Sequence, residues 1–148
     1  RILQFAQDNC AVEVEYLRPD GQVVKVKGFD FAAQRNTGRG GVVSSEWTAQ
    51  MVLAFKIMAD YYNKKGVLNK AQAYTLKANE YLGELSKMII SSPSASGQGA
   101  SCLPYATQDL ADTGHGWMTP KGSHTGSVSA TAYTLFAYYG FNPLELKE

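Results

Sequence analysis

The sequence has no long hydrophobic run, almost no net charge and few cysteines, and each of these shortages excludes a class of function. No apolar segment approaches the roughly 20 residues that a membrane-spanning helix needs, so no membrane partner is expected. The 14 basic and 13 acidic residues leave a formal net charge of +1. A chain so nearly neutral has no electrostatic reason to bind nucleic acid.

The motifs of several common active sites are also missing. Cys10 and Cys102 form no C-x-x-C pair, which argues against a structural zinc site, and either free thiols or a bridge between them fits the sequence. His115 and His124 have no third ligand in a metal-binding pattern, so neither a metal nor another cofactor is expected. No serine lies in a G-x-S-x-G elbow, and G-R-G-G at residues 38–41 lacks the lysine-serine end of a phosphate-binding loop.

The length and composition that remain suit one globular domain. A chain of 148 residues, 45% of them hydrophobic, can bury one substantial core but is too short for two. It begins inside an apolar stripe, residues 1–7, that reads as the end of a helix. We therefore interpret residues 1–148 as a single domain from the C-terminal part of a longer protein, whose missing N-terminal part would be a partner of this domain.

Residues 12–27 predict a β-hairpin. Apolar residues alternate with glutamate before the turn and with lysine after it, which is the period of a half-buried strand. Pro19-Asp20-Gly21 has the chemistry of a bulged three-residue loop with glycine in the left-handed conformation. This loop predicts a register with complementary partners on both faces: Tyr16 with Val24, Val14 with Val26, Glu15 with Lys25, and Glu13 with Lys27.

Two long helices should follow the hairpin. Apolar residues recur with helical spacing over residues 46–65 and again from Asn69 onward. Ser44 or Ser45 can cap the first helix, and Asn69 with Gln72 forms a capping-box pattern for the second. Only a few residues separate these helices, so we expect them to pack antiparallel.

Residues 112–145 combine a loop dense in glycine, histidine and tryptophan with a last helix. Val128, Ala132, Leu135, Phe136 and Tyr139 share the spacing of one helical face and are predicted to pack inward. The small residues 129–132 should let the first turns of this helix approach another backbone closely. Gly140 should cap this helix in the left-handed conformation. The serine- and glycine-rich stretch at residues 91–101 is instead predicted to be a poorly ordered surface loop.

The candidate site residues gather around this loop and the start of the first long helix. Trp47 and Trp117 stand where an indole can stack on the flat face of a sugar, although both rings could equally close the end of the core. Glu46 and Asp112 are candidate catalytic acids, because glycoside hydrolysis requires two carboxyl groups around the scissile bond. Three further residues complete the predicted site: His115 as a group that titrates near neutral pH, and Asp109 and Arg39 as contacts to substrate.

Two segments resemble a known architecture. Residues 46–56, E-W-T-A-Q-M-V-L-A-F-K, look like an inner helix of six-hairpin (α/α)-toroid glycosidase-like proteins. G-W-M-T-P followed by S-V-S-A-T-A-Y-T-L-F-A-Y-Y-G-F-N-P resembles their last inner helix. The resemblance implies a mainly α fold of helical hairpins, with the β-hairpin as an insertion. It also implies an oligosaccharide or polysaccharide ligand, bound in a cleft at one end of the toroid.

The function expected from these patterns is that of a carbohydrate-active, glycoside hydrolase-like fragment that binds a saccharide at the loop end of packed helices. Whether the fragment is itself an enzyme stays open. The alternative is a non-catalytic helical domain that binds a protein partner through the same aromatic end. Two close carboxylates in an open groove would favour the first, and an exposed apolar patch with every acid paired to lysine or arginine would favour the second.

Overall fold

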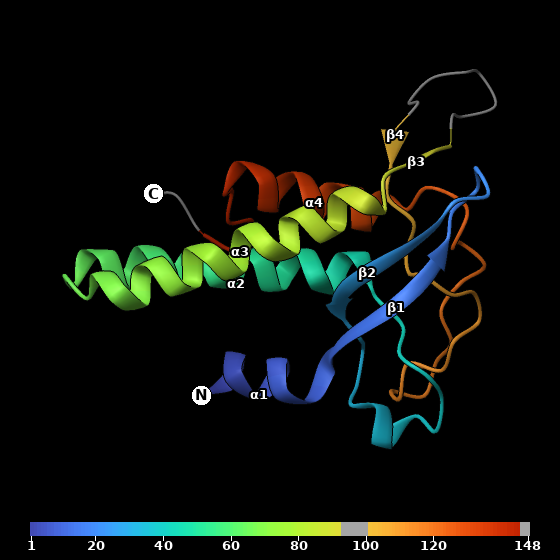
Figure 1. The fold of residues 1–148 in the computed structure, drawn as a ribbon, viewed down its shortest axis with the longest axis horizontal. Helices are drawn as coiled ribbons and strands as arrows, with labels where there is room; N and C mark the ends of the chain where they lie inside the picture. Colours follow the sequence, from blue (N-terminus) through green and yellow to red (C-terminus); the bar gives the residue numbers. More distant parts are fainter. Residues whose placement is uncertain (93–100, 146–148) are drawn as a thin grey trace.

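A computed structural model describes residues 1–92 and 101–145. The elements follow in the order α1 (Ile2–Cys10), β1 (Ala11–Leu17), β2 (Val23–Phe29), the short 3₁₀ helix η1 (Gln34–Asn36), α2 (Ser45–Lys64), α3 (Leu68–Lys87), β3 (Ile90–Ser91), β4 (Ser101–Cys102) and α4 (Val128–Tyr139). Figure 1 shows α2, α3 and α4 side by side, with the β1–β2 hairpin and long loops gathered at one end. Most of the stretch at 91–101, predicted to be poorly ordered, lies outside the described residues.

The expected fold class, a mainly α toroid of helical hairpins, is wrong. The described residues form a mixed α/β domain with two small antiparallel sheets, β1–β2 and β3–β4. The reason is that the hairpin belongs to the core instead of standing outside it as an insertion. Tyr16, Val26 and Phe29 are buried against the helices, and the Phe29 amide donates to Thr48 Oγ1 of α2 at 2.9 Å.

The hairpin itself has the predicted register. Tyr16 pairs with Val24, Val14 with Val26, Glu15 with Lys25, and Glu13 with Lys27. Gly21 has a φ of +81°, in the left-handed region that the turn chemistry predicted. Local turn chemistry and alternation were therefore sufficient to set this element.

The two long helices also pack as predicted, with one error at a helix start. α2 and α3 lie against each other as an antiparallel pair, and Ser44 caps α2 by accepting from the Trp47 amide at 3.3 Å. The capping box at Asn69 is wrong, because Val67 occupies the cap position of α3 without a side-chain hydrogen bond. Asn69 instead bonds its neighbour, the Lys70 amide, at 2.9 Å.

The last helix ends where predicted, but its predicted face packs inward only in part, through Phe136. Gly140 closes α4 with a φ of +69°. However, Val128, Leu135 and Tyr139 are 88%, 51% and 76% exposed, whereas Ala130 and Ala137 are fully buried. The small alanine side chains allow α4 to approach α2 closely, and the larger residues are left facing outward.

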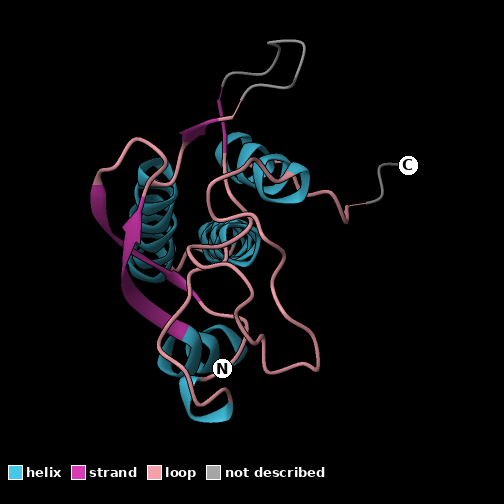
Figure 2. Cartoon of the chain, turned by 90° about the vertical axis from the view of Figure 1, so that its right-hand side faces the viewer, coloured by secondary structure: helices cyan, strands magenta, loops and turns pink. Residues whose placement is uncertain are grey.

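Long loops close the end of the domain at which α2 and α4 begin. Figure 2 views this end face-on and shows the loops crossing in front of the helices. Tyr16 joins the hairpin to them, because its hydroxyl donates to the Ser123 carbonyl at 2.5 Å. His124 makes a second link from its Nε2 to the Leu17 carbonyl at 2.9 Å. Burial raises the pKa of Tyr16 to about 12, so its hydroxyl stays protonated as a donor.

Replacing Gly21 with alanine should destabilise the domain by about 1–2 kcal/mol, the cost of a left-handed conformation for an L-residue. Gly83→Ala is the matched control, because neither glycine has an atom within 4 Å of an added Cβ and Gly83 lies in α3 without a positive φ. This control should stabilise the domain by about 0.5–1 kcal/mol. Denaturant titration measures both, and equal effects would contradict the assigned turn.

Tyr16→Phe should cost about 1 kcal/mol at neutral pH, since the buried Ser123 carbonyl loses its donor. Because burial raises the folded pKa of Tyr16 from 10.0 to about 12, the contribution of the phenol is complete below pH 10 and declines as the pH rises towards 12. The stability advantage of the wild type over Tyr16→Phe should therefore shrink across that interval. Denaturant titrations at a series of pH values test this, and a constant difference would contradict it.

Candidate functional site

An aromatic cluster lies at the loop end of α2. The buried ring of Phe31 is at its centre, with Trp47 edge-on at 5.2 Å and Trp117 edge-on at 5.6 Å between ring centroids. Tyr105 stacks on the same ring at 5.9 Å. The two tryptophans, distant in sequence, thus meet through one phenyl ring, and Trp117 remains 41% exposed.

The loop that carries Trp117 is held tightly by its own backbone. Thr113 donates to the Trp117 carbonyl twice, from its amide at 3.1 Å and from its hydroxyl at 2.7 Å. Gly114 and Gly116 have φ values of +75° and +83°, which glycine adopts without strain. A Cβ on Gly114 would also come within 2.9 Å of the Ala32 side chain. The indole is therefore presented from a backbone of fixed shape.

His115, in the same loop as Trp117, lies beside Trp47 and Phe31. Its ring is 5.7 Å from that of Trp47, and its Nε2 is 2.8 Å from the Phe31 carbonyl oxygen. Because a carbonyl only accepts, Nε2 carries a proton, and in the neutral ring Nδ1 is left as an acceptor. His115 can thus accept a hydrogen bond from a ligand at the edge of the cluster.

The two candidate acids stand on different elements, Glu46 on α2 and Asp112 in the Trp117 loop. Glu46, in the first turn of α2, is half-buried and accepts from Gln50 Nε2 at 3.2 Å. The pKa of Tyr105 is raised mainly by burial and further by the negative charge of Glu46, which places that carboxylate near the aromatic rings. Asp112 is half-buried and accepts from the Gly114 amide at 2.8 Å. Within the described residues no hydrogen bond joins the two acids.

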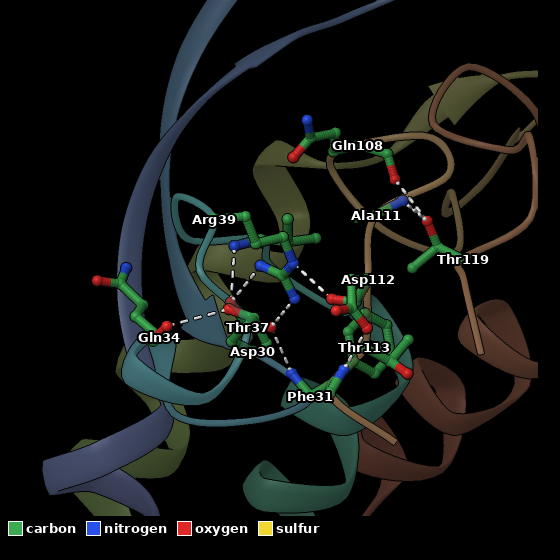
Figure 3. Close-up of polar contacts among 12 residues, drawn as sticks. Asp30, Phe31, Gln34, Thr37, Arg39, Gln108, Ala111, Asp112, Thr113 and Thr119 are labelled. Carbon is green, nitrogen blue, oxygen red and sulfur yellow. Dashed lines mark hydrogen bonds and ion pairs between the residues drawn. The ribbon is translucent and has the colours of Figure 1, made fainter. Parts of the chain in front are cut away.

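A buried ion pair supports this end of the domain, and sequence reasoning missed it. Asp30 accepts two hydrogen bonds from the guanidinium of Arg39, at 2.7 and 2.8 Å, and one each from the amides of Phe31 and Val42 (Figure 3). Arg39 Nε also donates to the Asp112 carbonyl. Arg39, predicted to contact substrate, instead ties the connector after β2 to the Trp117 loop. The sequence G-F-D-F places Asp30 between two phenylalanines, and this pattern could have indicated a buried carboxylate that needs a partner.

Asp109 has a similar supporting position. Its Oδ1 accepts from the amides of Ser123 and Gly122, at 2.6 and 2.8 Å. These hydrogen bonds, that from Ser123 foremost, lower the pKa of the Asp109 carboxyl group, so it is ionised at neutral pH. In the structure this predicted substrate contact holds the turn that leads into α4.

Two features, a metal-binding cluster and a membrane-spanning helix, are absent from the part of the chain that the structure describes. There, no three side chains of histidine, cysteine, aspartate or glutamate cluster in a way that could hold a metal ion. Across residues 1–92 and 101–145, every helix is too short or too polar to cross a bilayer.

Comparison with known proteins finds no match for this chain among family models, curated proteins or solved structures.

Asp30→Asn should destabilise the domain by about 3–5 kcal/mol, because it leaves the half-buried Arg39 charge without its counter-ion. Asp60→Asn is the control: it removes the carboxylate of an exposed pair with Lys64 and should leave stability almost unchanged, because solvent screens such a pair. Chemical denaturation of both variants measures the difference. A loss for Asp30→Asn no larger than that of the control would show that the pair does not hold the loop end.

Proposed function

We propose that the loop end of the domain binds an oligosaccharide, with the Trp117 indole stacked on one sugar ring. The observation that carries this proposal is a half-exposed indole held in one orientation by Phe31, Tyr105 and the hydrogen bonds of its own loop. An indole that is already fixed loses little conformational entropy when a flat ligand face covers it.

Polar groups around the indole support the same ligand class. A sugar presents hydroxyl groups that both donate and accept, and a site for it needs fixed partners of both kinds. His115 offers an acceptor at Nδ1, and Glu46 and Asp112 offer carboxylate oxygens.

The reaction that fits these groups is glycoside hydrolysis. In the described residues, the hydrogen bonds of Glu46 and Asp112 each engage one carboxylate oxygen. We assign the proposed reaction to this pair, with one group as the acid and the other as the ionised carboxylate, assisted by His115. Glu46 is bonded to glutamine and not to lysine or arginine, which distinguishes it from a purely structural acid such as Asp30.

A second candidate function, the binding of a protein partner, is favoured by a different surface. Leu135, Tyr138 and Tyr139 of α4 are all more than half exposed, and they line a groove of about 540 Å³ between α3 and α4. Apolar side chains in such a groove are a common feature of protein interfaces. This surface is separate from the tryptophan cluster, so the two candidates can be tested independently.

Trp117→Ala should weaken oligosaccharide binding by about 1–2 kcal/mol, on the order of tenfold, through loss of the stacking face. Calorimetric titration with cello-, malto-, xylo- and chito-oligosaccharides identifies the ligand and measures the change. Tyr138→Ala is the matched control, since it removes an exposed aromatic ring from α4 and should leave binding unchanged.

The thermal midpoint of each variant separates a binding effect from unfolding. Trp117→Ala should cost clearly less than the about 3–5 kcal/mol of a truncated core tryptophan, because its ring is 41% exposed. A wild-type protein that binds none of these sugars would refute the proposal and leave the α3–α4 groove as the better candidate.

A further inference from the structure

A cavity of about 340 Å³ lies between α1 and α2, beside the tryptophan cluster. Its wall combines Ala6 and Cys10 of α1 with Trp47, Gln50, Met51 and Ala54 of α2. The volume is near the lower end of the about 300–1,000 Å³ that small-molecule sites occupy. A ligand of one or two rings would fill it, whereas a peptide helix would not fit.

The cavity wall has little to offer a polar ligand. Asp30 is among the lining residues, but its side chain is fully buried and its two carboxylate oxygens already accept four N–H groups from Arg39, Phe31 and Val42. Burial raises the pKa of the Cys10 thiol, and the nearby Asp30 charge raises it further, so the thiol stays neutral. A sugar or an ion that entered here would lose hydration without replacement, and that loss is costly. An apolar ligand has no such cost.

The shape of the wall favours a flat ligand. Trp47 contributes an indole whose ring packs against those of Phe31 and His115, at centroid distances of 5.2 and 5.7 Å. Met51 adds a polarisable thioether, which packs well against aromatic rings. Gln50 is exposed and stands where the wall meets solvent, so a polar substituent on the ring could reach it.

The opposite wall is a helix that lacks strong packing of its own. α1 contains no fully buried residue, and Ile2 and Phe5 are 85% and 61% exposed. A ligand against Ala6 and Cys10 would therefore give α1 apolar contacts that it does not make without one.

We propose that the cavity between α1 and α2 binds a small molecule through a planar apolar ring, packed between Trp47 and Met51 on one side and α1 on the other. The proposal does not depend on saccharide binding at Trp117, although Trp47 borders both places. In a glycoside bound at the loop end, such a ring would be the non-sugar part of the molecule.

The test uses toluene as the probe and the methyl carbons of Met51, Ala6 and Ala54 as reporters in NMR titrations. Saturable shifts at these methyl groups are expected, together with slower amide hydrogen exchange in α1 at saturating toluene. Shifts confined to Leu82 and Leu135 of the α3–α4 groove, or no saturable shift at all, would overturn the proposal.

Ala54→Leu places a larger side chain in the cavity and should weaken toluene binding by about tenfold or more. Ala73→Leu, at an exposed position of α3, is the matched control and should bind as the wild type does. Ala6→Leu fills the cavity from α1 and serves as the second filling variant if circular dichroism shows that Ala54→Leu does not fold. Undiminished binding in a folded filling variant would overturn the proposal.

Discussion

The loop end of the domain depends on one ion pair between the buried carboxylate of Asp30 and the half-buried guanidinium of Arg39. Asp30 follows β2 directly, and its carboxylate satisfies two backbone amides and two guanidinium N–H groups at once. Arg39 also donates a hydrogen bond to the Asp112 carbonyl, so the same side chain fixes the position of the Trp117 loop. A buried pair of this kind contributes little net stability, because desolvation offsets attraction, but it strongly disfavours any arrangement that separates the partners. Its effect is to give the connector and the loop one shared geometry.

That geometry explains how distant aromatic residues come together. Phe31 is next to Asp30 in sequence, so fixing the carboxylate also fixes the phenyl ring on which Trp47 and Trp117 lie. Trp47 arrives from the first turn of α2 and Trp117 from a loop rich in glycine. The candidate saccharide contact is therefore built from three separate segments of the chain. Hydrogen bonds that involve the backbone hold each segment in place, in addition to side-chain packing.

The features that sequence reasoning predicted correctly are those set by neighbours along the chain. The hairpin register follows from Pro19-Asp20-Gly21, and the end of α4 follows from Gly140. What it missed depends on distant contacts. The burial of the hairpin against α2 decides the fold class. The close approach of small residues at the start of α4 was predicted, but the exposure of Leu135 and Tyr139 that goes with it was not. The Asp30–Arg39 pair bridges a glycine-rich loop whose path no local pattern specifies. Sequence reasoning grouped the two tryptophans because one stands at a helix start and the other in a loop. It did not predict that the Phe31 ring joins them.

The hydrogen bond from Tyr16 to Ser123 also bears on how the domain folds. It connects residues 107 positions apart, whereas α2 and α3 are neighbours along the chain and joined by a short turn. Bringing such distant segments together loses more loop-closure entropy than forming the helix pair does. This entropy is lost before the contacts at the loop end have formed and can offset it. The candidate site is likewise assembled by contacts between distant residues, such as Phe31 with His115 and Arg39 with Asp112. The α2–α3 pair can form first and serve as the surface on which the hairpin and the aromatic loops come together.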